Sequence, residues 1–349
     1  MFNIHSDPRQ TPREETWKDW FAQGVSVNVE QVRKVAELLK SLPENGYGLN
    51  FYSFIKNGEE VVACDMYPPL NCPQAVNFFF FVCMHQYGFW RGDDRGYLKP
   101  LTGRVYSQSF KGSDLIWRVA KRAFDSDEYI FEPAVLMSMT PEVLSRKVFY
   151  DDNGPILFPD LEMRFRLTRA YGRWFAARQI SPAQMVEVAN ATDAPLRTFL
   201  MSLKIVPGFD GDNLEKKNLL LAMILANRSE KFLNAKDSEN WRPIVDYHLM
   251  RTALRLGLVD LGAGLYKDNA ERRWACREAE GAIRMAVYDA IQTLIKLSGR
   301  PMSYVNEKMW MARRYCPEME RPDCAKCVFE SVCKKRVELF QPVFRTTAY

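Results

Sequence analysis

A chain of 349 residues, of which 47% are hydrophobic, can bury a sizeable core as one large domain or two ordinary ones. Its net charge of +5, from 48 Lys and Arg against 43 Asp and Glu, is compatible with a phosphate-bearing partner but does not require one. No hydrophobic run approaches the roughly 20 residues of a membrane helix, and residues 1–15 lack the hydrophobic segment of a signal peptide, so we expect a soluble cytoplasmic protein with no membrane partner.

Helices dominate the predicted elements of the first hundred residues. Residues 29–42 place their hydrophobic side chains on one stripe, which is typical of an amphipathic helix. Two strand-like stretches, 47–55 and 59–67, flank a turn and predict a small hairpin. Pro73, at a favoured first helical position, begins a stretch through Tyr87 that is apolar nearly all round, so we expect a buried helix there.

The middle of the chain continues as helices. Ser113 and Thr140 are the expected N-caps of two of them, because their side chains can accept hydrogen bonds from the first turn. Residues 161–179 predict a long amphipathic helix with arginines on its outer face. The turn-rich stretch 150–160 is the best candidate for a domain boundary.

Three further helices are predicted towards the C-terminus. Gly299 is expected to end the last of them as a C-cap. Because strand-like stretches are few, the pattern predicts an all-α fold. The three helical stretches are 216–228, 245–260 and 277–299.

Half of the eight cysteines lie close together near the C-terminus, in the spacing C-x7-C-x2-C-x5-C. In a reducing compartment such a cluster indicates metal binding rather than disulfides. Four thiolates can ligate one tetrahedral zinc or one [4Fe–4S] cluster. Zinc ribbons usually carry two C-x2-C knuckles, whereas this stretch has one knuckle and short loops, so we favour a [4Fe–4S] cluster, with zinc as the alternative. The four ligands would be Cys316, Cys324, Cys327 and Cys333.

The cysteine spacing resembles the C-terminal iron–sulfur loop of the endonuclease III and adenine glycosylase families, which is C-x6-C-x2-C-x5-C. The first gap is one residue longer here. In those families the cluster is structural and fixes a loop whose basic residues approach DNA phosphates. Cations near the thiolates can equally offset the negative charge of a cluster. The basic residues around the cysteines are Arg313, Arg314, Arg321, Lys326, Lys334, Lys335 and Arg336.

Upstream of the cysteines, "VDYHLMRTALRLG" (residues 245–257) resembles the "VDTHVxRVxxRLG" stretch of the same DNA glycosylases. The resemblance implies that Asp246 is the catalytic aspartate. Asp246 is at a predicted helix start, where the helix dipole stabilises a negative charge. Cleavage of an N-glycosidic bond builds positive charge on the sugar. A fixed carboxylate can stabilise this charge or orient the attacking water. A purely structural N-cap is the alternative role of Asp246.

The stretch "VPGFDGDNLEKK" (residues 206–217) resembles the helix-hairpin-helix "LPGVGxKTA", whose backbone amides bind a DNA phosphate. The resemblance makes Lys216 or Lys217 a candidate nucleophile, and Lys217 a candidate for binding a 5′-phosphate; a solvated helix face is the ordinary alternative. Carboxylates in this loop would repel DNA, which argues against a duplex-DNA enzyme. They belong to Asp210, Asp212 and Glu215.

Most of the chain resembles, segment by segment and in the same order, the queuosine-salvage N-glycosylases, which share the DNA-glycosylase helical core and release queuine from its nucleoside or 5′-monophosphate. "QAVNFFFFVCMHQYGFW" matches their "xAVxxxFxVDTLNFxFW" in shape, and "VDYHLMRTALRLGLVD" resembles their "FxDYRLPQVLxxLGxL". Asp246 and Tyr247 then match that family's catalytic aspartate and its tyrosine. Two departures are Cys83, in place of an aspartate, and the four-cysteine tail, which the usual members lack.

This resemblance implies an all-α, helix-hairpin-helix glycosylase-like core with an N-terminal helical extension and a C-terminal four-cysteine loop. Residues 1–150 would contribute to the base pocket, 151–300 would form the core, and 301–349 would hold the cluster loop and tail. The substrate would be a small modified nucleoside or 5′-monophosphate of the 7-deazaguanine type. The expected substrate-binding residues are His85, Gln86, Tyr87, Phe89, Trp90, Tyr247 and His248.

Two other functions remain open from the sequence. One is an iron–sulfur DNA glycosylase that acts on a damaged base, with duplex DNA as the less favoured partner. The other is a non-catalytic iron–sulfur protein that binds nucleic acid.

Overall fold

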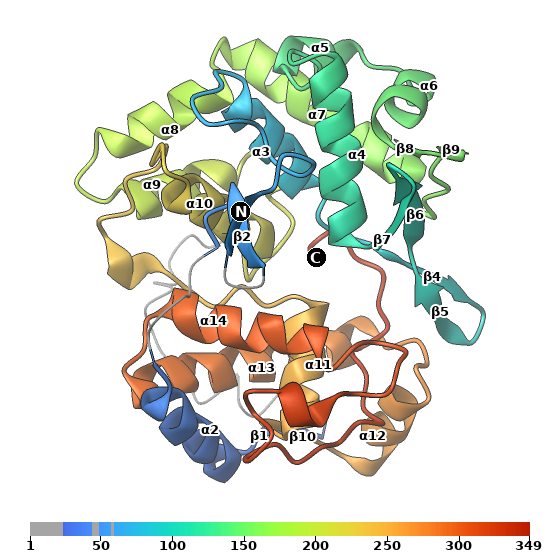
Figure 1. The fold of residues 1–349 in the computed structure, drawn as a ribbon, viewed down its shortest axis with the longest axis vertical. Coiled ribbons are helices and arrows are strands. Elements are labelled where there is room, and N and C mark those ends of the chain that lie inside the picture. Colours follow the sequence, from blue (N-terminus) through green and yellow to red (C-terminus); the bar gives the residue numbers. More distant parts are fainter. Residues whose placement is uncertain (1–23, 44–48, 57–58) are drawn as a thin grey trace, which may run out of the picture. The chain divides into compact units, whose positions relative to one another are not determined.

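The computed structural model describes residues 24–43, 49–56 and 59–349 (Figure 1), so the expectations for residues 1–15 and for the turn at 57–58 lie outside the described residues. Helices dominate, and the strands of the described part pair only as two-stranded sheets. The expected helical class is therefore confirmed as mostly α. Within the described ranges, every helix is too short or too polar to cross a lipid bilayer.

The chain divides into two compact units. Of the described residues, unit 1 contains 24–43, 94–97 and 245–344, and unit 2 contains 49–56, 59–93, 98–244 and 345–349. These units divide the chain at other positions than the three segments expected from the sequence, whose functional division stays a prediction. The stretch 150–160 lies inside unit 2 and does not separate the units.

Unit 1 is built around its longest helix, α13 (Arg277–Ser298), which packs against α2, α11 and α14 (Figure 1). Gly299 ends α13 with φ +66°, so the predicted C-cap is confirmed. Gln31 on α2 donates its side-chain amide to Leu256 O and Val332 O, which ties α2 to the cysteine loop. The other elements are α2 (Val29–Ser41), α11 (Tyr247–Leu256), α12 (Ala263–Ala270), α14 (Met302–Met311), the antiparallel pair β1 (Val25–Val27) and β10 (Val259–Leu261), and short 3₁₀ turns at Ala312–Arg314 and Cys324–Lys326.

Unit 2 has α3 (Ala75–Met84) in its core. The four phenylalanines Phe78 to Phe81 are fully buried, and each contributes roughly 1.5–3 kcal/mol to folding. Phe81 stacks on Phe131 with 4.3 Å between ring centroids. The other helices are α4 (Ser113–Ser126), α5 (Pro133–Ser138), α6 (Pro141–Val143), which continues as a π-helix (Leu144–Val148), α7 (Leu161–Arg178), α8 (Pro182–Asn190), α9 (Pro195–Leu203), α10 (Lys216–Asn227) and a 3₁₀ turn (Ser238–Asn240).

Four antiparallel hairpins complete the strands. The predicted hairpin of β2 (Ser53–Lys56) and β3 (Glu59–Val62) is confirmed, with shorter strands than expected. Three hairpins were not predicted, although the last of them has Asn153-Gly154, the signal that marks tight hairpins, at its turn. These are β4 (Trp90–Asp93) with β5 (Gly96–Pro100), β6 (Thr102–Val105) with β7 (Gln108–Lys111), and β8 (Tyr150–Asp151) with β9 (Gly154–Pro155).

Several local predictions need correction. The helix expected from Pro73 begins at Ala75. Gly112, with φ +56°, is the N-cap of α4, whereas Ser113 is its first residue and donates its hydroxyl to Gln86 Oε1 at 2.7 Å. The prediction of arginines on the outer face of α7 is wrong for Arg164, which is fully buried. The Thr140 cap of α6 is confirmed by a 3.3 Å bond from Val143 N–H.

Candidate functional site

Asp246 in unit 1 caps the N-terminus of α11. Its Oδ1 atom accepts a hydrogen bond from Leu249 N–H at 3.0 Å, and the residue is 9% exposed. The preceding carbonyl, Val245 O, accepts from Arg284 Nε at 3.2 Å and from Nη2 at 3.1 Å. The carboxylate and the peptide before it are therefore both held in place. The predicted helix start is confirmed, and the catalytic role stays a prediction.

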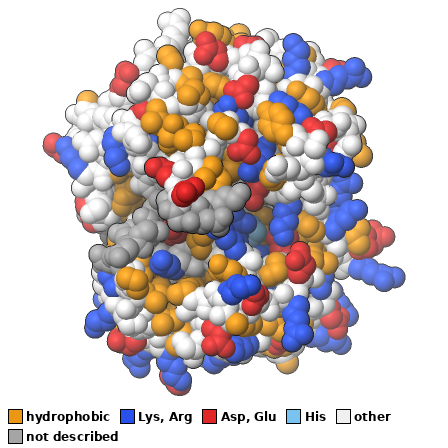
Figure 2. Space-filling model, in the orientation of Figure 1, with side chains coloured by type: hydrophobic (Ala, Val, Ile, Leu, Met, Phe, Trp, Pro, Cys, Tyr) orange, Lys and Arg blue, Asp and Glu red, His pale blue; other side chains and the backbone are white. Residues whose placement is uncertain are grey.

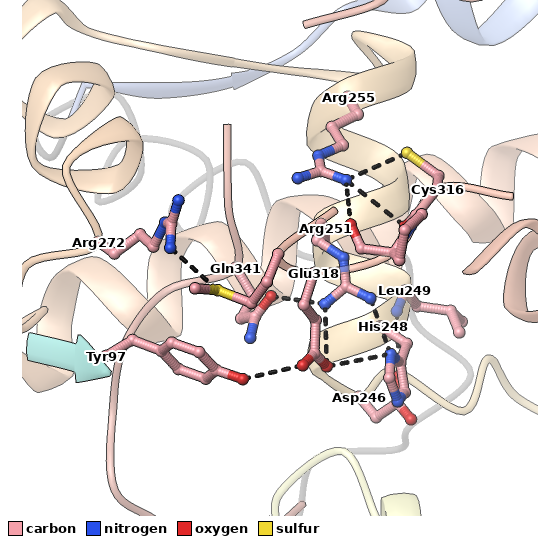
Figure 3. Close-up of polar contacts among 12 residues, drawn as sticks. Tyr97, Asp246, His248, Leu249, Arg251, Arg255, Arg272, Cys316, Glu318 and Gln341 are labelled. Carbon is pink, nitrogen blue, oxygen red and sulfur yellow. Dashed lines mark hydrogen bonds and ion pairs between the residues drawn. The ribbon is translucent and has the colours of Figure 1, made fainter. Parts of the chain in front are cut away.

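His248 and Arg251 lie three residues apart on α11, so their side chains are neighbours on one face of the helix. Arg251 is 2% exposed, and its Nη2 lies 3.0 Å from His248 Nδ1 (Figure 3). A guanidinium can only donate, so His248 Nδ1 accepts, and neutral His248 carries its proton on Nε2. The second guanidinium nitrogen of Arg251 donates to Gln341 Oε1 at 2.7 Å.

Glu318 is a buried carboxylate two residues after the first cysteine of the loop. Arg251 Nη1 lies 3.5 Å from its Oε1, His248 Nδ1 lies 4.0 Å from the same atom, and Tyr97 OH donates to its Oε2 at 2.8 Å (Figure 3). Both oxygens have partners, which offsets the cost of burying the charge. Sequence reasoning missed Glu318, because no local pattern marks a carboxylate whose partners lie far away in the chain.

Tyr247 lies beside this carboxylate and beside Asp246. Burial first, and then the charges of Glu318 and Asp246, raise the pKa of Tyr247 well above its ordinary value. Its hydroxyl therefore stays protonated at neutral pH and can serve as a hydrogen-bond donor or acceptor. This is compatible with the substrate-binding role expected for Tyr247, which stays a prediction.

The four cysteines of the loop lie near one another in unit 1. Burial raises the pKa of the Cys327 and Cys333 thiols, and the neighbouring thiols, including Cys316 and Cys324, raise both further. Arg255 Nη1 donates to Cys316 Sγ at 3.2 Å, and Lys335 N–H donates to Cys333 Sγ at 3.3 Å. The structure thus brings together the four residues that the sequence selected.

The arrangement of these thiols bears on which metal group they fit. One tetrahedral zinc would hold its sulfurs roughly 3.8 Å apart, whereas irons and sulfides hold the ligands of a cubane further apart. Across the described ranges, no three His, Cys, Asp or Glu side chains are gathered closely enough for a single metal ion. Which group the four thiols bind stays a prediction. Amide and guanidinium donors to cysteine sulfur are also typical of iron–sulfur sites.

The basic residues around the cysteines are partly paired within the unit. Lys326 lies 2.7 Å from Asp323, Lys335 2.5 Å from Glu330, and Arg336 2.6 Å from Asp260. On the face drawn in Figure 2, Lys and Arg are interspersed with Asp and Glu rather than gathered into one basic surface. The role of these cations towards DNA phosphate stays untested.

In unit 2, four consecutive carbonyls at the C-terminal end of α3, from Met84 to Tyr87, accept hydrogen bonds from buried cations. Lys216 and Lys217 are 5% and 3% exposed, so the interpretation of this pair as a solvated helix face is wrong. Cations are favourable at the negative end of a helix. We call this group the α3 clamp: Lys217 Nζ to Met84 O at 3.2 Å, Arg164 Nη1 to His85 O at 2.9 Å, Lys216 Nζ to Gln86 O at 3.0 Å, and Arg164 Nη2 to Tyr87 O.

Lys217 has an unusual environment for a lysine. Burial first, and then the charge of Lys216, lower the pKa of Lys217 to about 7. Its Nζ lies 5.3 Å from the ring centroid of Tyr87. It lines a cavity of about 30 Å³, enough for about one water molecule and too small for a nucleobase. The other lining residues are Leu167, Gly208, Asp210, Gly211, Asp212, Thr347 and Ala348.

The turn held by the α3 clamp contains buried polar atoms without partners. Thr168 Oγ1 donates to Arg164 O at 2.8 Å, so His85 Nε2 must donate to Thr168 Oγ1 across their 3.0 Å contact. Burial, with the charges of Arg164 and Lys217, keeps the pKa of His85 well below its ordinary value, so the ring is neutral. Its Nδ1 is then an acceptor that meets no donor in the described part of the chain. Among the described residues, Gln86 Nε2 and Tyr87 OH of the same turn and the Asn218 amide on α10 also lack partners.

The aromatic residues among the expected substrate-binding residues of unit 2, whose rings a base could stack on, are buried: Tyr87, Phe89 and Trp90. The guanidinium carbon of Arg164 lies 4.1 Å from the ring centroid of Tyr87 and 5.8 Å from that of Phe89. The guanidinium carbon of Arg345 lies 4.4 Å from the Trp90 ring. Cations therefore contact these aromatic rings in this structure, and base stacking on them stays a prediction.

The loop between α9 and α10 satisfies its own amides. Asp210 Oδ1 accepts from Gly208 N–H at 3.2 Å, and Asp212 accepts from Leu214 N–H at 3.1 Å and from Lys216 N–H at 2.8 Å. Gly208 has φ +91°, and a Cβ there would lie 2.5 Å from Met84 Cγ, so the position requires glycine. Carboxylates of the loop thus occupy the amides that would contact a phosphate.

A larger cavity of about 380 Å³ contains none of the predicted site residues. It lies in unit 2, between the beginning of α3 and α8. Its lining residues are Asn71, Cys72, Pro73, Val76, Ala183, Val186, Glu187, Glu230 and Phe232. Cavity size alone therefore does not mark the candidate chemistry.

The predicted residues form two groups. Asp246, Tyr247, His248 and the four cysteines belong to unit 1, while Lys217 and residues 85–90 belong to unit 2. No family model and no curated protein matches this chain. The resemblances rest on the quoted motifs, and the activity must be argued from the residues themselves.

Proposed function

We propose that this protein is an N-glycosidase that hydrolyses the N-glycosidic bond of a modified, 7-deazaguanine-type nucleoside or its 5′-monophosphate. The observation that carries this proposal is the position of Asp246. Its carboxylate is fixed at the N-terminus of α11, with one oxygen bonded to Leu249 N–H and the other not engaged by any described residue. A preorganised carboxylate of this kind suits a reaction that builds positive charge on a sugar.

In the proposed reaction, water adds to C1′ of the sugar as the bond from C1′ to the base nitrogen breaks. The bonding electron pair leaves with the base, which gains a proton. Asp246 stabilises the cationic sugar and accepts the proton that water loses; this proton then returns to solvent, which supplies the proton that the base gains. A fixed charge of this kind contributes on the order of 3–6 kcal/mol to the transition state, or roughly 10²–10⁴ in rate.

Unit 2, taken by itself, contains polar groups that suit the edge of a base. In the described part, the turn after α3 offers an unpartnered acceptor at His85 Nδ1 and a donor at Gln86 Nε2, and α10 offers both kinds of atom at Asn218. Buried polar atoms are rarely left without partners, and the edge of a purine-like base carries both donors and acceptors. A base could bind beside Lys217 only if side chains moved, because the cavity lined by Lys217 holds only about one water molecule.

The loop between α9 and α10 supports a small substrate rather than duplex DNA. Asp210 and Asp212 already satisfy three of its amides, and their charges repel phosphate. The helix-hairpin-helix glycosylase-like core and the kinship with queuosine-salvage enzymes belong to the same proposal and rest on the order of the quoted motifs.

We further propose that Cys316, Cys324, Cys327 and Cys333 bind a [4Fe–4S] cluster. The mutual influence of the thiols and the donors at Cys316 and Cys333 support it. The cluster would hold the loop in place and take no part in bond cleavage.

The proposal is tested by incubating the purified protein with a panel of modified nucleosides and their 5′-monophosphates, and following the free base by mass. Release of a 7-deazaguanine-type base is expected. A lesion-containing DNA duplex is included, since release from the duplex alone would support the DNA glycosylase alternative. No release from any substrate, by protein that holds its cluster, would contradict the proposed activity.

A further inference from the structure

Arg255 is the side chain through which α11 reaches the cysteine loop. Its guanidinium is buried and donates through Nη1 to Cys316 Sγ at 3.2 Å and to Pro317 O at 2.9 Å (Figure 3). Its Nε donates to Leu339 O at 2.8 Å, which fixes the plane of the group. Its own carbonyl lies 3.5 Å from Cys333 Sγ. One residue therefore touches both the first and the last cysteine of the loop.

We propose that Arg255 sets the reduction potential of the cluster by donating an N–H···S hydrogen bond to the Cys316 sulfur. This inference rests on the proposed [4Fe–4S] cluster. Hydrogen bonds to cluster sulfurs and the burial of nearby charge are the means by which a protein tunes such potentials. Because the guanidinium is buried, solvent screens its charge only weakly.

The direction of the effect follows from charge. Reduction adds one electron to the cluster and its thiolates, so a donor and a positive charge at Cys316 stabilise the reduced form more than the oxidised form. Loss of Arg255 should therefore lower the potential. Lysine in its place keeps the charge but lacks the planar fork that reaches the sulfur and two carbonyls together.

The experiment measures the one-electron potential of the loaded full-length protein by electrochemical titration, with an electrode as the source of electrons. Arg255→Gln should change the ratio of oxidised to reduced cluster at a fixed potential by roughly tenfold towards the oxidised form, or about 59 mV for one electron. Arg255→Lys should fall between this variant and the wild type. Faster bleaching of the absorbance near 400 nm in air should accompany the shift.

Arg272 provides the matched control, because its Nη1 donates to the sulfur of Met319 in the same loop at 2.9 Å. Arg272→Gln removes the same charge and an arginine–sulfur contact without touching a cysteine, and it should leave the potential unchanged. Equal potentials in wild type and Arg255→Gln would overturn the inference, as would an equal shift in Arg272→Gln. If Arg255→Gln cannot be loaded, an unchanged potential in Arg255→Lys overturns it as well.

The iron content separates this inference from the proposal on which it rests. Wild-type protein that holds zinc, or no metal, contradicts the cluster itself and the inference with it. Loaded wild-type protein whose potential is insensitive to Arg255 contradicts only the role of Arg255.

Discussion

The surroundings of α11 and the α3 clamp bury arginine and lysine in different ways. In unit 1, Arg251 and Arg255 reach side-chain partners, the Glu318 carboxylate and the Cys316 sulfur, as well as carbonyls. In the clamp of unit 2, backbone carbonyls accept most of the bonds from the cations, and polar atoms of the same turn remain without partners. The first arrangement pairs its cations with side chains and leaves Arg251 Nε without a partner in the described part, whereas the second leaves several polar groups around one turn unused.

This difference indicates separate roles for the two regions. Charge pairs such as Arg251 with Glu318 fix the geometry around α11. Unpartnered buried groups such as His85 Nδ1 represent free energy that a ligand can recover. The surroundings of α11 therefore suit a fixed reactive group, and the turn after α3 suits the binding of a ligand.

Removal of one cysteine should have the largest effect on unit 1. Cys327→Ser should lower the iron content from about four per chain towards zero and destabilise the loop and the end of α11, because metal binding at such sites is coupled to folding. Iron analysis and thermal unfolding measure both effects. Cys276→Ser, which changes a cysteine outside the loop, should keep the iron, and equal losses in the two variants would contradict the assignment of the ligands.

Removal of a cation should destabilise the α3 clamp strongly. Arg164→Met leaves His85 O and Tyr87 O without their donor and removes the cation from the Tyr87 ring, at a cost of about 3–5 kcal/mol in unfolding free energy. Arg166→Met, two residues away, breaks only an exposed pair with Glu162 and should cost less than about 1 kcal/mol. Chemical denaturation of both variants compares the costs, and equal values would show that the clamp is not a stabilising unit.

Asp289 on α13 tests what an unpaired carboxylate costs in unit 1. Burial raises its pKa to about 7, and its Oδ2 meets no hydrogen-bond partner in the described part. Because the folded-state pKa exceeds the ordinary 3.8, the folded protein holds a proton that the unfolded chain loses, so stability falls as pH rises from about 4 to 7. Asp289→Asn should therefore stabilise the protein by up to about 4 kcal/mol at pH 8. The gain should vanish near pH 4, and a gain independent of pH in paired thermal scans would contradict the raised pKa.

The smallest effect is expected in the loop between α9 and α10. Asp212→Asn keeps the size of the cap but removes its charge, which should strengthen binding of duplex DNA at low salt by roughly two- to fivefold, because a helix N-terminus favours anions. Asp193→Asn, a change of the same charge at an exposed position, should have less effect. Fluorescence anisotropy at two salt concentrations measures both variants. Tight, lesion-selective binding by the wild type would reverse the preference for a small substrate.

The sequence predicts those parts of the fold that depend on local patterns. The hydrophobic stripe of α2, the C-cap at Gly299 and the N-cap at Asp246 all follow from short-range rules and are confirmed. Helices α8 and α9 were missed although Pro182 and Pro195 mark their first turns.

The long-range contacts of the candidate site were not predictable. In the sequence, Arg164 looks like one more arginine on the outer face of an amphipathic helix. Only the folded chain brings it to the end of α3, where backbone carbonyls accept its hydrogen bonds. The pairing of the buried Glu318 carboxylate similarly depends on Arg251 and Tyr97, which lie far from it in the sequence. Motif spacing selected Asp246 and the cysteines, whereas the residues that hold them required the structure.

The central claim, that the Asp246 carboxylate performs chemistry and is not only a helix cap, is tested most directly by the turnover number of Asp246→Asn on a nucleoside that the wild type cleaves. Asparagine can still cap α11, so folding and iron content should be preserved, while kcat should fall roughly 10²–10⁴-fold and KM should change little. Asp237→Asn is the matched control, because Asp237 is also buried and accepts from two backbone amides, those of Leu196 and Arg197, and this variant should retain wild-type turnover. If the folded, iron-loaded Asp246→Asn variant cleaves the substrate within tenfold of the wild-type rate, Asp246 is only a cap and the proposed mechanism is wrong.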